Sequence, residues 1–102
     1  MRIYKVKANG AVGVKHIDAT KEAMEREVGG EFQKIRLIPD KEIVCICRKS
    51  GFSAKLPTNI LLPELMGDVF FVATQGKKFY SLTDGQLNRV KAFFGRRSIW
   101  KR

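Results

Sequence analysis

Two short runs that are apolar at every position constrain the fold more than any other feature of the chain. They are residues 43–47 (Ile-Val-Cys-Ile-Cys) and 69–73 (Val-Phe-Phe-Val-Ala). Successive side chains of a β-strand point to opposite faces of the sheet, so a strand that is apolar throughout buries both faces. A membrane span needs about 20 apolar residues, and these runs are far shorter. We therefore expect two central strands of one sheet and no membrane segment.

Alternation of apolar and polar residues indicates further strands. The alternating segments are residues 1–8, 12–17, 32–38 and 78–81. Asn9-Gly10 favours a type I′ hairpin turn between the first two, because both central residues of that turn need positive φ. Pro39-Asp40 favours a turn after the third segment. Residues 56–66, which hold two of the three prolines, are expected to form a loop.

Two helices are predicted from their end signals. Thr20, or Asp18 just before it, can cap a helix over residues 20–28, and Gly29-Gly30 supplies a left-handed end. Thr83 and Gln86 match a capping box, in which each side chain accepts the backbone N–H of the other residue. Gly95 is expected to end this second helix.

The elements add up to an α+β domain, a mostly antiparallel sheet of five or six strands with two helices packed on one face. A chain of this length fits a single domain with one small core, since it buries about 60–65% of its unfolded surface. We expect residues 1–95 to form that domain and residues 96–102 to form a basic C-terminal tail.

Three motifs in this order resemble the DUF3846 family. They are Val28-Gly29-Gly30, Leu56-Pro57-Thr58-Asn59 and Ser81-Leu82-Thr83-Asp84-Gly85-Gln86. The similarity covers residues 1–94. Members of this family are small proteins of bacteria, phages and other mobile elements without an assigned function, so the resemblance implies a fold and a genetic setting but no catalytic residues. Ile60 stands where the family pattern has arginine, and the basic C-terminal residues lie beyond the resemblance.

Positive charge is concentrated in the last third of the chain. Residues 69–102 hold eight Lys and Arg against one acid, whereas residues 1–68 hold twelve against nine acids. The net charge of +10 attracts polyanions at long range. Lysine and arginine also occupy the polar faces of two predicted strands, so a second basic patch is expected on the sheet.

These bases are candidate nucleic-acid contacts, and the single tryptophan is a candidate ring for base stacking. The C-terminal candidates are Arg89, Lys91, Arg96, Arg97, Trp100, Lys101 and Arg102. The strand candidates are Lys5, Lys7, Lys34 and Arg36. An alternative for the end of the chain is a loose tail, or one in which Ile99 and Trp100 fold back over the second helix.

No pattern indicates an enzyme, a metal site or a cofactor. Cys45 and Cys47 share one strand face, and with His16 as the only histidine they fall short of the ligands that zinc needs. We interpret both cysteines as core residues. His16 and Asp18 fit an exposed pair better than a general base. Two cysteines give no disulfide framework, which favours a reducing, cytoplasmic compartment.

The leading hypothesis is a non-enzymatic phage or mobile-element accessory protein that binds the phosphate backbone of nucleic acid. Little base specificity is expected, because no helix-turn-helix, zinc-finger or RRM signature is present. The alternative is an anti-defence protein that inhibits a host nucleic-acid-associated protein complex by direct contact. A third possibility is a pocket for an anionic nucleotide near the Asn59 loop.

Overall fold

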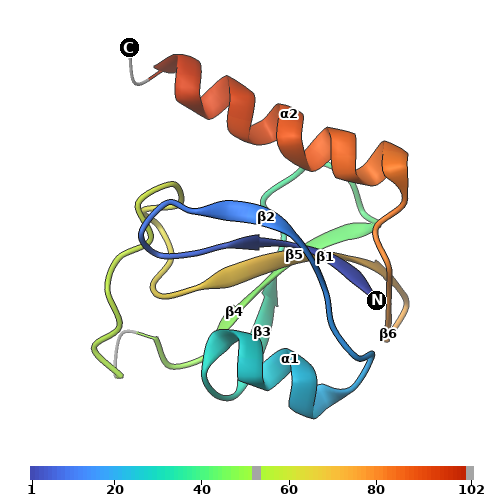
Figure 1. Cartoon of the computed structure of the whole chain (residues 1–102), viewed down its shortest axis with the longest axis horizontal. Helices are drawn as coiled ribbons and strands as arrows, with labels where there is room; N and C mark the ends of the chain where they lie inside the picture. The colour runs from blue at the N-terminus through green and yellow to red at the C-terminus, as the bar shows by residue number, and fades with distance from the viewer. Residues whose placement is uncertain (52–53, 101–102) are drawn as a thin grey trace.

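The protein folds as a six-stranded antiparallel sheet with two helices (Figure 1), which confirms the predicted α+β class. The computed structural model describes residues 1–51 and 54–100, with side chains as far as Arg96. The helices are α1 (Lys21–Val28) and α2 (Asp84–Trp100). The strands are β1 (Arg2–Val6), β2 (Val12–His16), β3 (Phe32–Ile35), β4 (Ile43–Arg48), β5 (Val69–Gln75) and β6 (Lys78–Tyr80).

Strand β5 lies at the centre of the sheet, whose order is β2-β1-β5-β4-β3, with β6 also paired to β5. All of its residues except the last are buried. Phe71 on one face packs in a core with Tyr4 and Phe94, whereas Phe70 on the other face packs with Met24. The apolar run 69–73 is therefore a central strand buried on both faces, as the sequence predicts.

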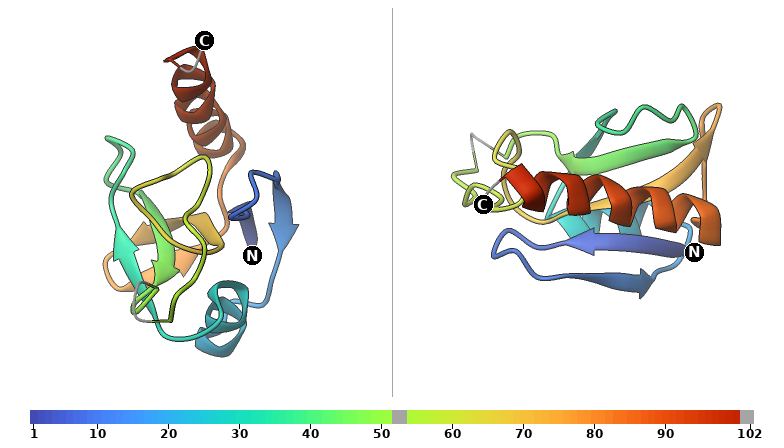
Figure 2. Two further views of the ribbon diagram at one scale, coloured as in Figure 1. Left: turned by 90° about the vertical axis from the view of Figure 1, so that its left-hand side faces the viewer. Right: turned by 90° about the horizontal axis from the view of Figure 1, so that it is seen from above.

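The two helices cover opposite faces of the sheet, so the prediction that both pack on one face was wrong (Figures 1 and 2). Met24 and Val28 of α1 join the core that contains Val44 and Val72. The buried side of α2 joins the core on the other face. The physical reason is that strands apolar at every position have two faces to bury, and one layer of helices covers only one.

The helix caps form at the residues that the sequence predicts. The Thr20 hydroxyl accepts the Ala23 N–H at 3.1 Å, and α1 ends at Gly29 with a φ of 86°. In the capping box of α2, Thr83 N–H donates to Gln86 at 2.9 Å and Gln86 N–H donates to Thr83 at 3.1 Å. Within the described residues, neither helix is long and apolar enough to cross a membrane.

Two local expectations were wrong. The β1–β2 hairpin forms, but Asn9 keeps a negative φ and only Gly10 is left-handed, at 92°. The turn is thus a three-residue loop, in which the Asn9 side chain accepts the Ala11 N–H at 3.0 Å. Gly95 does not end α2, and residues 96–100, expected to form a tail, continue the helix to Trp100. Glycine weakens a helix by about 1 kcal/mol but ends it only where the backbone turns left-handed.

Asn59 holds the connection that precedes β5. Its side chain is fully buried. Its amide group donates to the carbonyls of Val6 at 3.3 Å and Gly67 at 3.0 Å, and its Oδ1 accepts the N–H groups of Leu61 and Leu62 at 3.1 Å each. One side chain therefore satisfies three backbone groups of the irregular connection and ties it to the end of β1 through the Val6 carbonyl.

We expect Asn59→Ala to lower the free energy of unfolding by about 2–4 kcal/mol, because buried backbone groups lose their partner. Chemical denaturation measures the change. Asn88→Ala, on the exposed side of α2, is the control and should change stability by less than about 0.5 kcal/mol. Equal effects of the two substitutions would contradict the role of Asn59.

Gly95 and Gly76 form a matched pair that tests the backbone of α2 and of the β5–β6 turn. A Cβ meets no atom within 4 Å at either position, but Gly76 has a φ of +65°. We expect Gly95→Ala to stabilise the protein by about 0.5–1 kcal/mol. We expect Gly76→Ala to destabilise it by about 1 kcal/mol, because alanine is strained in the left-handed region. Urea unfolding curves that show the reverse signs would contradict both assignments.

Candidate nucleic-acid interface

The strand lysines do not form one open basic face. Lys5 and Lys34 lie in the same row across the sheet, but Phe70 and Ile46 stand between them. Three strand spacings of about 4.8 Å separate the two lysines by roughly 14 Å. Helix α1 covers these two apolar residues. The sheet face that was expected to be exposed and basic is therefore buried between the two lysines.

Lys5 forms ion pairs with two carboxylates. Its ammonium lies 2.9 Å from Glu27 on α1 and 3.7 Å from Asp68, and its side chain is only 13% exposed. Lys15 binds the same glutamate at 2.9 Å. Burial alone raises the pKa of Glu27, but hydrogen bonds and charge from Lys15 and Lys5 outweigh it and lower that pKa. Lys5 therefore ties α1 to the sheet, whereas Lys7 lies exposed in the hairpin loop.

The bases of α2 do not form one patch either. Arg89 pairs with Asp40 of the β3–β4 loop, and Arg96 lines a small cavity beside that pair. Lys91 is exposed and stands about 200° around the helix axis from Arg89. The side chains of Arg97 and Trp100 and the whole of Lys101 and Arg102 lie outside the described residues.

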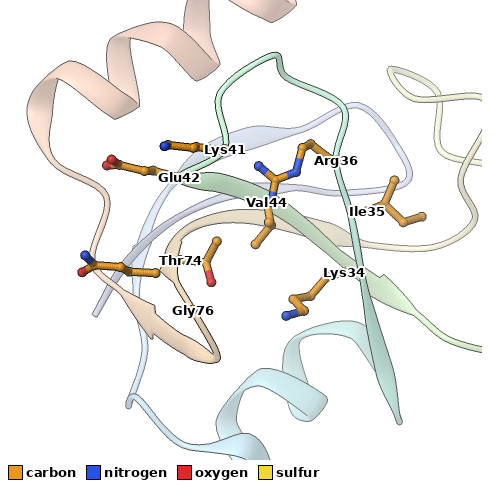
Figure 3. Close-up of a pocket in the computed structure, with 9 residues that line it drawn as sticks. Lys34, Ile35, Arg36, Lys41, Glu42, Val44, Thr74 and Gly76 are labelled. Atoms are coloured by element: carbon orange, nitrogen blue, oxygen red, sulfur yellow. The ribbon is translucent and has the colours of Figure 1, made fainter.

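Lys34 and Arg36 instead meet Lys41 around a cleft of about 410 Å³ on the α1 face of the sheet. The cleft is bounded by β3, the start of β4 and the β5–β6 turn, and Val44 and Thr74 lie inside its lining (Figure 3). All three cations are exposed, whereas Val44 and Thr74 are buried. The arrangement is a buried floor surrounded by exposed positive charge, and such a site is suited to an anion.

Side chains of β3 and β6 meet beside this cleft. The Lys34 ammonium lies 5.8 Å from the centre of the Phe79 ring on β6, and the rings of Phe32 and Phe79 meet edge-on at 6.1 Å. Strands β3 and β6 are separated in the sheet by β4 and β5. Their side chains meet only because the sheet curls across the α1 face. A cation over an aromatic face contributes about 0.5–1 kcal/mol at an exposed site.

Within the described residues, no carboxylate forms an ion pair with a cation of the cleft. Among the ion pairs of the described residues, none includes Lys34, Arg36 or Lys41. Arg36 donates to the backbone carbonyl of Asp40 at 3.3 Å, which orients its guanidinium. Glu42 is the one acid in the cleft lining. The local charge is therefore about +2, and a bound phosphate would balance it.

Sequence reasoning missed Lys41 and Thr74. Lys41 follows the Pro39-Asp40 turn, so its approach to Lys34 depends on how the β3–β4 connection folds back. A usable signal was present, because Lys34, Arg36 and Lys41 all flank one hairpin and antiparallel pairing returns the chain beside itself. Thr74 gave no signal. Its hydroxyl donates to the Lys78 carbonyl at 2.9 Å, so its position depends on the β5–β6 turn.

The cysteines behave as core residues, as predicted. Cys45 and Cys47 are free and buried, and burial holds the pKa of the Cys45 thiol well above its usual value. In the part of the chain that the structure describes, no three His, Cys, Asp or Glu side chains gather as metal ligands would.

A model of one protein family matches residues 1–95, nearly the whole chain. The chain belongs to the DUF3846 family, described as a domain of unknown function. No curated protein and no solved structure matches significantly. The motifs that indicated this family have structural roles in the DUF3846 domain: Gly29 ends α1, Asn59 holds the loop before β5, and Thr83 begins α2.

Stability should fall in acid through Glu27. Its lowered pKa in the folded state means that its contribution is complete above the unfolded pKa of about 4.3 and is lost as the pH falls through the folded value. We expect Glu27→Gln to be less stable than the natural protein at pH 7 and to lose less stability between pH 7 and pH 3. Unfolding curves across this range measure both. Glu22→Gln, an exposed change on the same helix, should keep the natural pH profile.

Proposed function

We propose that this protein binds nucleic acid through its phosphates, with the cleft of Lys34, Arg36 and Lys41 as the main contact. The observation that carries the proposal is the convergence of three exposed cations without ion-pair partners on one cleft. Lysine and arginine are the side chains that bind phosphate, and arginine can do so with two parallel hydrogen bonds.

The charge balance of the whole chain favours a polymeric anion over a single small one. Of the ten acids, Glu27, Asp40, Asp68 and Asp84 already bind bases within the chain. A large positive surplus therefore remains for solvent and partners. Exposed Lys7, Lys91 and Arg96 lie at other sites and would add long-range attraction.

The proposal includes no catalytic step. It keeps the predicted setting, a phage or mobile-element protein that acts in the cytoplasm, and the free buried cysteines are compatible with a reducing compartment.

Replacing the three cleft cations tests the proposal. We expect the triple variant Lys34→Gln, Arg36→Gln, Lys41→Gln to bind a labelled single-stranded oligonucleotide at least tenfold more weakly at ~50 mM salt. The log–log salt slope should flatten by about 2, since each contact with a single strand contributes about 0.7. Fluorescence anisotropy across a salt series measures both quantities.

A variant with the same loss of charge is the control. Lys7→Gln, Lys49→Gln, Lys91→Gln removes three exposed lysines outside the cleft and should weaken binding much less. Equal losses in the two variants would assign the binding to net charge and would contradict the cleft. Absence of binding by the natural protein at ~50 mM salt would overturn the proposal itself.

The second candidate is inhibition of a host defence complex by protein contact, and one observation favours it. Val12 and Val14 on the edge strand β2 are 47% and 44% exposed, and they lie on the sheet face opposite the cleft. Val12→Lys, Val14→Thr would block such a contact while leaving oligonucleotide binding unchanged. Retained binding of a purified partner complex by this variant would count against the second candidate.

A further inference from the structure

A second cavity lies beside the basic cleft, between the first turn of α1 and strand β6. It has a volume of about 460 Å³. Its lining is largely apolar and aromatic, with Met24, Phe32, Phe79 and Tyr80 among its residues. Lys21 and Lys78 also contribute to it, and its described lining contains no acid.

The cleft and this aromatic groove have no lining residue in common, but residues that are neighbours in the sheet line one or the other. Phe32 lines the groove and Lys34 lines the cleft, and they are neighbours on the same face of β3. The Lys34 ammonium is turned toward the β5–β6 hairpin (Figure 3) and lies 5.8 Å from the Phe79 ring centre. Across the hairpin, Gln75 of the cleft pairs with Lys78 of the groove. Positive charge and aromatic rings are therefore adjacent.

We infer that the two cavities together hold one nucleoside phosphate, with its phosphate in the cleft and its base in the groove. This inference rests on the proposed function and adds a base-binding subsite to it. A phosphate satisfies Lys34, Arg36 and Lys41, and a base offers a flat π-face to aromatic side chains. An apolar ligand would leave the cations unused, and an acidic peptide would leave the rings unused.

The inference selects single-stranded nucleic acid among polymers. Bases of a duplex are stacked and paired, so they reach a groove only after they are unstacked. A single strand presents phosphate and base together, and so does a free nucleotide. The shared chemistry is the nucleoside phosphate, and competition experiments distinguish its two sources.

An abasic oligonucleotide isolates the contribution of the base. We expect the natural protein to bind a thymidine oligonucleotide about tenfold more tightly than an abasic oligonucleotide of the same length, which is within the range for one stacked base. Both should give the same salt slope, because they carry the same phosphates. Equal affinities would overturn the base subsite and leave phosphate binding intact. Failure to bind either oligonucleotide would overturn the proposed function as well.

Substitutions in the groove locate the preference. Phe32→Leu and Phe79→Leu keep apolar volume, and each removes a ring on the α1 face of the sheet, where the groove lies. We expect each to reduce the tenfold preference to about twofold or less while abasic binding is unchanged. Phe93→Leu on α2 is the matched control and should keep the preference. A full preference in both groove variants, with natural unfolding curves, would overturn the assignment to this groove.

Competition with thymidine monophosphate identifies the source. Displacement of the oligonucleotide by the mononucleotide at a similar concentration of phosphate groups would identify a free nucleotide as the ligand. Displacement only by longer strands would identify single-stranded nucleic acid. In either case the amide resonances of Gly76 and Phe79, which border the two cavities, should shift on titration, and unchanged resonances at saturating ligand would overturn the location.

Discussion

Burial of both faces of β5 is the constraint on which the rest of the structure depends. Its side chains alternate between two separate cores, one with α2 and one with α1. Each face must be covered, so a small chain has to divide its two helices between them. The longer helix, α2, covers one face with Leu87, Val90 and Phe94. The other face receives only α1, whose eight residues extend about 12 Å.

The basic cleft exists because the short helix α1 leaves part of its sheet face uncovered. Helix α1 covers the middle of its face, where Ile46, Phe70 and Val72 are buried. Beyond the helix the sheet curls, and the edge strand β3 meets β6 through Lys34 and Phe79. The uncovered corner is floored by buried residues and surrounded by long cationic side chains, whose stems can lie on apolar surface while their charges face water. The proposed phosphate site thus lies at a corner of the sheet that α1 does not cover.

Local features of the fold were predictable because they depend on neighbouring residues. The capping box at Thr83 and the left-handed Gly29 require only short-range hydrogen bonds and backbone preference, and both appear as predicted. The placement of the two helices on opposite faces could have been inferred from the strands that are apolar on both faces, but it was wrongly predicted. The pairing of Lys5 with Glu27 was not available, because it joins residues 22 apart through the docking of α1. The same limit applies to Lys41, whose place depends on the β3–β4 connection.

Linear charge density is a weak guide to the electrostatic surface, and this chain shows why. The C-terminal third is the most basic part of the sequence, yet Arg89 is paired with Asp40 of the β3–β4 loop, and the only acid of that third, Asp84, binds Arg2 at the other end of the chain. Ion pairs between distant segments thus change how much unpaired charge each segment keeps. Arg36 keeps its charge because Asp40, the nearest acidic residue along the chain, is engaged by Arg89. Lys34 lies nearer to Glu31, but in the described structure neither of these two residues takes part in an ion pair. Which positive charges stay unpaired in the described structure depends on which carboxylates already form ion pairs, and the unpaired cations around the cleft are the reason for proposing it as the main phosphate contact.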